Sequence, residues 1–253
     1  MIKQFQTDHL KVYIYETRME MGKSAADDIA SRIRSVLQNK ESCRIIFAAA
    51  PSQNEMLSNL IAAPSIDWNR IHAFHMDEYV GLDQDAPQGF GNFLHASLFR
   101  HLPFASVNYI NGNAADLKEE CIRYAGLLTE HPIDIVCMGI GENGHIAFND
   151  PDTADFNDCD VVKKVTLDET CRNQQVNDGC FSALSSVPKT ALTLTIPALI
   201  LADSIFCVVP AATKSRAVFR TIHDPVDTDC PASILRTHTN AVLYLDKDSA
   251  GLL

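Results

Sequence analysis

The stretch IDIVCMGI, at residues 133–140, is a nearly continuous apolar run that leads into glycine-rich, polar sequence. Such a run is typical of a strand buried on both faces of a parallel sheet. Comparable runs lie at residues 12–15, 43–50, 70–76, 161–167, 191–196, 204–210 and 241–246. Stretches that predict helices lie at 22–38, 53–63, 91–101, 116–131 and from about residue 214 onward. This alternation predicts an α/β fold in which helices cover both faces of a mostly parallel sheet.

The bulk composition fits one domain over residues 1–253 and excludes several classes of protein. The chain is 46% hydrophobic with a net charge of −11, which argues against a basic face for nucleic acid. The N-terminus is too polar for a signal peptide. Pro197 and Asp203 interrupt the apolar stretch at 191–209, which predicts strand, turn and strand rather than a membrane span. The cysteines include no C-x-x-C pair, and a reducing cytoplasm is the expected setting.

Polar groups follow four of the predicted strands. Ser52, Asp77 and Lys214 each come shortly after an apolar run. The run at 133–140 leads directly into GIGENGHIAFNDP, residues 139–151. Because parallel strands gather their carboxyl ends at one edge, where α/β proteins bind their ligands, these four segments are expected to meet there.

The acids after residues 70–76 offer a candidate base. Acids at such a place are most often solvated loop residues. A carboxylate at the end of a strand, inside a pocket, can instead act as a general base whose pKa is tuned by burial. Asp77 is nearer to the strand than Glu78 and is the preferred candidate. His72, His75 and Asp77 together offer too few ligands for a metal, and no metal is predicted.

Two predicted helix starts could bind an anion. SQNE, at 52–55, fits a capping box with Ser52 as N-cap and Glu55 three residues later. The free N–H groups of the same helix end would attract a phosphate. Lys214 lies near the start of another helix, where a cation opposes the helix dipole unless an anion shares the site. Ser52 and Lys214 are therefore candidate phosphate-binding residues, and helix initiation alone is the other interpretation.

The glycine-rich stretch has several interpretations. Gly139, Gly141 and Gly144 allow positive φ angles and the close approach of a ligand. Their G-x-G-x-x-G spacing is a weak indication of dinucleotide binding, because it lies in mid-chain and a proline soon follows. His145, with Asp150 five residues later, suggests an imidazole oriented by a carboxylate for acid/base chemistry. A purely structural histidine remains the alternative.

MDEYVGL (76–82) and GIGENGHIAFNDP (139–151) together resemble the glucosamine-6-phosphate deaminase/isomerase family. The likeness covers most of the chain, continuing through VPKTALTLTIPAL (187–199), VVPAATKSRAV (208–218) and ASILRTH (232–238). The related 6-phosphogluconolactonase family typically has G-x-G-x-D-G-H-T-A-S-L-F-P, so the residues I-A-F-N-D after the histidine favour the deaminase side. The resemblance implies a three-layer, Rossmann-like α/β fold of the sugar-phosphate isomerase type.

The resemblance also implies a role for each matched residue. Asp77 matches the aspartate that carries a proton between C2 and C1 of the open-chain sugar. His145 matches the histidine that assists opening of the sugar ring, and Asp150 matches a glutamate that positions it. Lys214 matches a phosphate-binding lysine, and Ser52 falls in the phosphate-binding turn.

Three features depart from the family pattern. Asn143 stands where the family usually has an aspartate, and an amide can orient an imidazole but cannot take a proton. Asp150 is one methylene shorter than the usual glutamate. The family's phosphate-contacting arginine has no clear match, and Arg172 lies nearby but shifted. Arg172, Gly141 and Gly144 are the remaining candidate substrate contacts.

The sequence therefore predicts an enzyme that opens an amino-sugar 6-phosphate, isomerises aldose to ketose and releases ammonia. Glucosamine 6-phosphate is the first choice of substrate, and galactosamine 6-phosphate is a rival because Asn143 is also seen, by resemblance, in galactosamine-6-phosphate isomerases. A 6-phosphogluconolactonase and a non-catalytic sugar-phosphate sensor are the other hypotheses. No cofactor is predicted, and the expected partner is a small sugar phosphate rather than nucleic acid or membrane. A homo-oligomer is left open.

Overall fold

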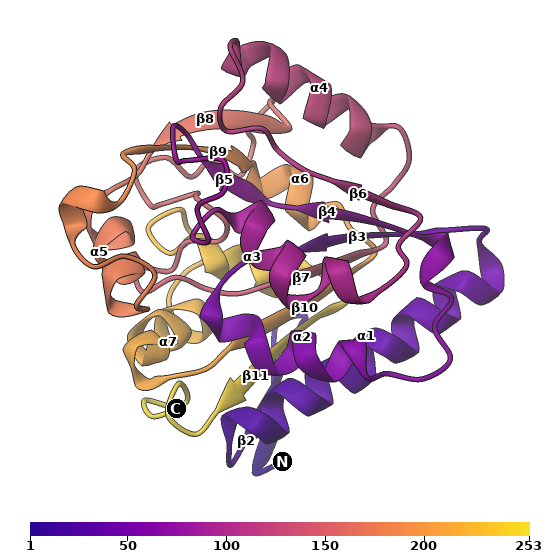
Figure 1. Cartoon of the computed structure of the whole chain (residues 1–253). Helices are drawn as coiled ribbons and strands as arrows, with labels where there is room; N and C mark the ends of the chain where they lie inside the picture. The colour runs from indigo at the N-terminus through magenta and orange to yellow at the C-terminus, as the bar shows by residue number, and fades with distance from the viewer.

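An eight-stranded sheet forms the centre of the computed structural model, which describes residues 1–253 (Figure 1). Its order is β1-β2-β11-β10-β7-β3-β4-β6, and all neighbouring pairs are parallel except β1 and β2. The strands are β1 (Lys3–Thr7), β2 (Leu10–Tyr15), β3 (Cys43–Phe47), β4 (Ile71–His75), β6 (Ser106–Asn108), β7 (Ile135–Met138), β10 (Ser204–Val209) and β11 (Ala241–Asp246). The predicted mostly parallel α/β sheet is confirmed.

Helices cover both faces of this sheet and enclose two apolar cores. The helices are α1 (Arg18–Asn39), α2 (Asn54–Ile61), α3 (Phe90–Ser97), α4 (Leu117–Thr129), α5 (Glu169–Asn177), α6 (Ile196–Ile200) and α7 (Ser215–His223). Residues of α1, α2 and α3 pack into one core, and residues of α4, α6 and α7 into the other. Along β3, Ile45 and Phe47 join the first core while Ile46 joins the second. Strands with a core on each face must be apolar throughout, which explains the continuous runs in the sequence.

A second, three-stranded sheet lies beside the first, at the upper left of Figure 1. It contains β5 (Asp77–Tyr79), β9 (Thr190–Leu194) and β8 (Val162–Thr166), and both of its pairings are antiparallel. The expectation that the runs at 161–167 and 191–196 join the parallel sheet is therefore wrong. Exposed residues interrupt β8, a pattern of half-buried antiparallel strands.

The apolar stretch at 191–209 also differs from the expected strand, turn and strand, because helix α6 lies between β9 and β10. Thr195 is the N-cap of α6, and its hydroxyl accepts a hydrogen bond from the backbone N–H of Ala198 at 3.4 Å. Pro197 lies in the first turn, where a missing N–H costs no helical hydrogen bond. The proline therefore starts a short helix rather than breaking the chain into a turn.

The predicted capping box at residues 52–55 is wrong as well. Pro51 starts a short 3₁₀ turn, Pro51–Gln53, so α2 begins after Gln53 and no side chain caps it. Glu55 instead forms an ion pair with Arg18 at 2.7 Å. Ser52 therefore does not hold the helix end, and its hydroxyl faces the pocket described below.

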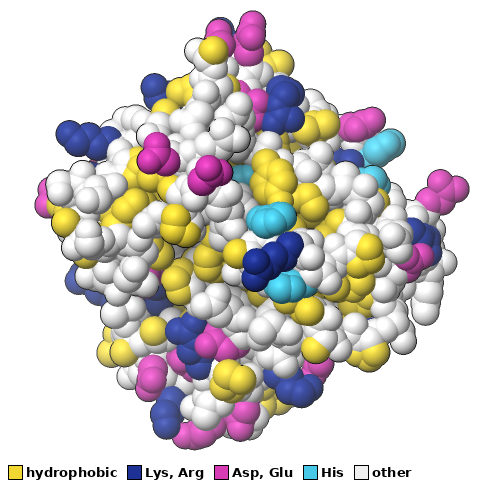
Figure 2. Space-filling model, viewed as in Figure 1, with side chains coloured by type: hydrophobic (Ala, Val, Ile, Leu, Met, Phe, Trp, Pro, Cys, Tyr) yellow, Lys and Arg dark blue, Asp and Glu magenta, His cyan; other side chains and the backbone are white.

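The surface carries no large area of one charge on the face shown in Figure 2, where acidic and basic side chains intermingle. That face therefore has no large basic area of the kind that binds nucleic acid. No helix has the length and apolar character needed to cross a membrane.

Candidate active site

A pocket of about 60 Å³ lies at the carboxyl ends of four neighbouring strands, β10, β7, β3 and β4. These strand ends point toward α5 and α7, at the left of Figure 1. Ser52, Asp77, His145 and Lys214 all line this pocket, each supplied by the segment after a different strand. The parallel topology thus brings together residues that lie as much as 162 positions apart, as Ser52 and Lys214 do (214 − 52).

A second cavity of about 320 Å³ adjoins the first and shares Ala49, Ala50 and Phe90 with it. Small-ligand sites usually occupy roughly 300–1,000 Å³. The inner pocket alone is smaller than that range, so a ligand that reaches Asp77 also extends into the outer cavity or displaces the side chains around it.

Asp77 begins β5 after a single residue, Met76, that follows β4. Its backbone pairs with Thr193 of β9, whose hydroxyl accepts a hydrogen bond from the Phe148 backbone N–H at 3.0 Å. The second sheet therefore ties the acid to the glycine-rich loop. Asp77 as a whole residue is only 7% exposed. Burial raises the pKa of Asp77 well above its ordinary value, and the charge of Glu78 adds to the effect. A pocket carboxylate with a raised pKa is suited to accept a proton.

His145 and Asp150 lie together in the glycine-rich loop, both buried. Nδ1 of His145 is 3.0 Å from Oδ1 of Asp150, although the direction of the ring N–H is unfavourable for a hydrogen bond. Burial raises the pKa of Asp150, but the His145 imidazole and the Asn143 amide outweigh burial and bring it below its ordinary value. An ionised Asp150 therefore faces the ring and can stabilise it when it carries a proton.

Asn143 forms hydrogen bonds with both His145 and Asp150 and with a third residue, Asp168. Its Nδ2 donates to Asp150 Oδ1 at 2.9 Å and to Asp168 Oδ2 at 3.1 Å. Its Oδ1 accepts a hydrogen bond from the backbone N–H of His145 at 3.0 Å. Asp168 is the N-cap of α5, so the amide joins this helix to the loop. A side chain at position 143 needs donors to sit between two carboxylates, and asparagine supplies them.

Lys214 supplies a cation to the same pocket. It ends the 3₁₀ turn Ala212–Lys214, and α7 begins at the next residue, as the sequence predicts. The residue is 4% exposed, and Nζ has no hydrogen-bond partner. Burial lowers the pKa of Lys214, because a desolvated ammonium without a partner is unfavourable. An anionic ligand group would provide the missing partner.

Ser52 offers a hydroxyl to the same pocket. Its Oγ accepts a hydrogen bond from Gln53 Nε2 at 3.1 Å, and this amide also donates to the Val208 carbonyl at 3.1 Å. Gln53 is fully buried, and its amide holds the Ser52 oxygen as a hydrogen-bond acceptor. The Ser52 O–H is therefore free to donate to a ligand.

The remaining candidates have different positions. Gly141 lines the pocket, and any side chain there would overlap the His145 ring. Gly144 does not line it: with φ at +92°, this residue packs against Cys230, whose Sγ would lie 2.8 Å from an added Cβ. Arg172 also lies outside the lining, and its Nη2 donates to the carbonyls of Leu184 and Val187 at 2.7 and 3.0 Å. The structure thus gives Gly144 and Arg172 contacts within the protein.

Helix α5 supplies two pocket residues that the sequence did not predict. Gln174 and Gln175 both lie on the buried face of α5 and line the pocket. The side-chain oxygen of Gln174 accepts a hydrogen bond from the backbone N–H of Glu142 at 2.8 Å, which holds α5 against the glycine-rich loop. Few residues of α5 are apolar, so its sequence has no clear helical pattern. Asp168 is a usual N-cap residue, and it was the one indication in the sequence that a helix begins at Glu169.

The histidines near Asp77 form no metal cluster. Nδ1 of His75 donates to the Asp77 carbonyl, and Nε2 accepts a hydrogen bond from Ile110 N–H, each at 2.9 Å. Burial lowers the pKa of His75 to about 4, so the ring is neutral. Nδ1 of His72 contacts the Ser106 hydroxyl instead. These rings act as structural supports of β4.

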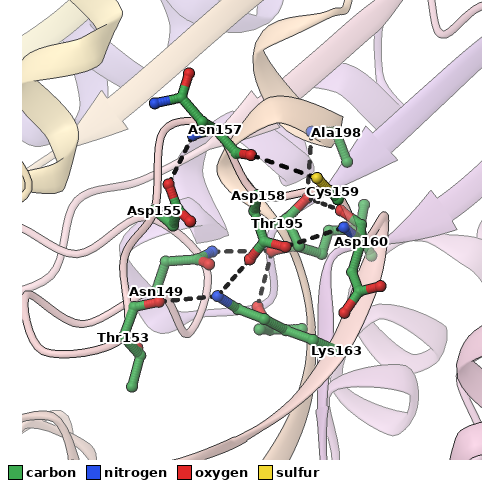
Figure 3. A network of polar contacts seen from close by, with 12 residues as sticks. Asn149, Thr153, Asp155, Asn157, Asp158, Cys159, Asp160, Lys163, Thr195 and Ala198 are labelled. Atoms are coloured by element: carbon green, nitrogen blue, oxygen red, sulfur yellow. Dashed lines mark hydrogen bonds and ion pairs between the residues drawn. The ribbon is translucent and has the colours of Figure 1, made fainter.

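A polar network fixes the chain that follows the glycine-rich loop (Figure 3). Asn149 Nδ2 donates to the carbonyl of Leu194 at 2.9 Å, just ahead of Thr195. Lys163 Nζ reaches the Thr153 carbonyl at 2.8 Å and the Asp158 carboxylate at 2.7 Å. The loop that carries His145 is thus anchored at its end to the second sheet.

The pocket therefore combines a buried carboxyl with a raised pKa, an imidazole beside an ionised acid and a buried cation without a partner. The cation and Ser52 can hold an anionic group, and the two other groups can move protons on the same ligand. Such a site suits proton transfer on a small molecule that carries a phosphate.

Comparison with known proteins gives a consistent family. The model of the family described as glucosamine-6-phosphate isomerases/6-phosphogluconolactonase matches residues 16–244. A glucosamine-6-phosphate deaminase of Lactobacillus delbrueckii subsp. bulgaricus is 32% identical over 244 residues, covering 96% of this chain and 100% of the relative. A glucosamine-6-phosphate deaminase of Listeria innocua serovar 6a is 36% identical over 205 residues, or 81% of this chain and 86% of the relative.

Solved structures share the fold. One described as a monomeric glucosamine-6-phosphate deaminase superposes with a TM-score of 0.87 and 30% identity, over 96% of this chain and 99% of that one. A 6-phosphogluconolactonase from Thermotoga maritima gives a TM-score of 0.76 at 20% identity, over 94% of this chain and 100% of that one. The second likeness shows the fold alone.

Proposed function

The chain belongs to the glucosamine-6-phosphate isomerase/6-phosphogluconolactonase family, and we propose that it is an enzyme that converts glucosamine 6-phosphate and water to fructose 6-phosphate and ammonia. The observation that carries the proposal is the meeting of Asp77, His145 and Lys214 in one pocket. The relatives support the deaminase branch, because the glucosamine-6-phosphate deaminases match at 30–36% identity and the Thermotoga lactonase at 20%.

In this proposal the two ends of the substrate have separate partners. Lys214 Nζ and the Ser52 hydroxyl hold the phosphate, which gives the buried ammonium the partner it lacks. His145, backed by ionised Asp150, moves the proton that opens the sugar ring. Asp77 takes a proton from C2 and returns it to C1, and the amine leaves as ammonia after water adds to the imine carbon. Fixing the phosphate positions the reacting carbons, which can supply several kcal/mol toward the barrier.

A galactosamine 6-phosphate enzyme is the nearest alternative, because only the C4 configuration differs and Asn143 also fits that subgroup. A second alternative is hydrolysis of 6-phosphogluconolactone, in which His145 would act as the base that activates water. A sensor without turnover would keep Lys214 and Ser52 but not use Asp77. The buried position of Asp77 in the pocket and its raised pKa favour an enzyme over a sensor, because carboxyls perturbed in this way cluster at catalytic sites.

The setting of the enzyme is also proposed. We infer that residues 1–253 form one domain that works in the cytoplasm on a small sugar phosphate, with no cofactor. The oligomeric state is either a monomer, as the similar solved structure is described, or a homo-oligomer. Light scattering of the purified chain distinguishes these two states.

Ammonia release measured with three substrates tests the function. Glucosamine 6-phosphate should give ammonia and fructose 6-phosphate in equal amounts, and galactosamine 6-phosphate should give ammonia more slowly. The 6-phosphogluconolactone should be hydrolysed no faster than in buffer. Faster lactone hydrolysis, with no ammonia from either hexosamine phosphate, would replace the proposal with the lactonase alternative.

A further inference from the structure

A cluster of three metal-ligating side chains lies behind the catalytic imidazole. His145 and Asp150 come from the glycine-rich loop, and Cys171 comes from the first turn of α5. One ligand atom from each lies within 4.8 Å of the others, and all three residues are buried. His145 lines the pocket, whereas Asp150 and Cys171 do not, so two of the three ligands lie outside the pocket wall.

The chemistry of these ligands favours one class of cation. An imidazole nitrogen, a carboxylate oxygen and a thiolate sulfur form the mixed set that Zn²⁺ binds, at about 2.0–2.3 Å. Mg²⁺ and Ca²⁺ prefer oxygen ligands alone. One carboxylate and one thiolate neutralise the charge of a divalent ion, and three protein ligands leave a fourth position for water. Nδ1 of His145 has no hydrogen-bond partner and is available as a ligand.

The surrounding hydrogen bonds already hold two of the ligands. Asn143 Nδ2 donates to Asp150 Oδ1 at 2.9 Å and bridges to Asp168 at 3.1 Å. Asp168 accepts a hydrogen bond from the backbone N–H of Cys171 through its other oxygen. Outer contacts of this kind orient metal ligands and strengthen binding. The same asparagine that departs from the family pattern therefore helps to build the cluster.

We propose that His145, Asp150 and Cys171 form a Zn²⁺-binding site that inhibits the enzyme, an inference that rests on the proposed function for its inhibitory part. Binding forms an Nδ1–metal, a carboxylate–metal and a thiolate–metal bond, and the Cys171 proton goes to solvent. The remaining imidazole proton is then fixed at Nε2, so the ring can no longer accept a proton from the sugar. Lys214 and Ser52 are not ligands, and the phosphate still binds.

Cobalt titration tests the site independently of catalysis. Metal-free full-length enzyme titrated with Co²⁺ should develop the near-ultraviolet absorption of a thiolate–cobalt bond, with one equivalent bound. C171S and C171A should lose the band, and C180S, which alters a cysteine nine residues away on the same segment, should keep it. Circular dichroism checks that each variant is folded. Absence of the band in the wild type, or its persistence in both Cys171 variants, would overturn the site.

Zinc titration of the deaminase activity tests whether metal binding at this cluster inhibits the enzyme. In the wild type, Zn²⁺ should lower kcat for ammonia release by about tenfold or more and leave KM within roughly twofold. The C171A enzyme should release ammonia at the wild-type rate and be insensitive to the same zinc concentration. Equal zinc sensitivity in C171A, or a rise in KM alone, would refute inhibition through this cluster. An enzyme with no deaminase activity would refute the proposed function, while the cobalt result would still decide the site.

Discussion

At the scale of single residues, the proposed role of Asp77 as the base predicts how the reaction should depend on pH. The carboxyl must be ionised to accept a proton, and burial, helped by Glu78, raises its pKa. The acid limb of kcat/KM should therefore lie above the value of about 3.9 that an exposed aspartate would give. A limb at or below that value would show that another group is the base.

The same pKa shift has a consequence for stability. The folded protein binds this proton more tightly than the unfolded chain does, so ionisation of Asp77 lowers stability as pH rises through its folded-state pKa. The D77N variant lacks this loss. Its melting temperature, relative to that of the wild type, should therefore be higher at neutral pH than at acidic pH.

Asn143 gives a second residue-scale prediction. In N143D, a third carboxylate would face Asp150 and Asp168 with no donor between them. We expect a loss of about 1–3 kcal/mol in the free energy of unfolding, measured by urea titration. N143D/D168N should recover most of the loss, because asparagine at 168 can donate and still cap α5. An additive effect of the two changes would contradict this coupling.

The sequence indicated much of the site at this scale. Asp77, His145 and Lys214 were predicted to meet because each follows a strand, and all three line one pocket. Arg172 was predicted to contact the substrate because it lies near the position of the family's phosphate-binding arginine. The sequence does not reveal that its guanidinium donates to two backbone carbonyls instead. The role of Asn143 required Asp168, a partner 25 residues away that no local pattern links to it.

At the scale of elements, the turn before α7 delivers Lys214 to the pocket. Ala211 precedes this turn with φ at 83°, and its N–H donates to the Asp246 carboxylate at the end of β11. An alanine rarely adopts this conformation, and it persists only where its surroundings enforce it. The position of the lysine is thus set by the sheet itself, a feature that no sequence pattern reveals.

Replacing Lys214 by methionine should have opposite effects on binding and stability. The loss of a charge-assisted contact should raise KM by roughly 10- to 100-fold, with a smaller effect on kcat. Without substrate the variant should melt higher, because a buried ammonium with no partner has been removed. K164M, at an exposed lysine of β8, is the matched control. An unchanged KM in K214M would remove Lys214 from the phosphate site.

The elements that the sequence predicted well are those with cores on both faces. Continuous apolar runs identified β3, β4, β7, β10 and β11 correctly. The second sheet was missed because β5 has only three residues and pairs with β9, more than a hundred residues later. Short strands are fixed by such distant pairing rather than by local propensity. Helix α5 was missed because few of its residues are apolar.

At the scale of the whole molecule, the central sheet should couple the two cores. Strands such as β3 contribute alternate residues to each core, so neither core can unfold without disrupting the other. We expect a single transition in which the fluorescence of Trp68, packed in the first core, and far-ultraviolet circular dichroism share one midpoint. Two separate midpoints would contradict the proposal of one domain over residues 1–253.

At this scale we assign proton transfer and phosphate binding to different side chains of one pocket. Ammonia release from glucosamine 6-phosphate by D77N, measured beside binding of the same compound, tests that division most directly. D85N changes an exposed acid of the nearby loop and is the control. We predict that D77N loses about 10²–10⁴-fold or more in kcat while its dissociation constant stays close to the KM of the wild type. Ammonia release at the wild-type rate would contradict the central claim.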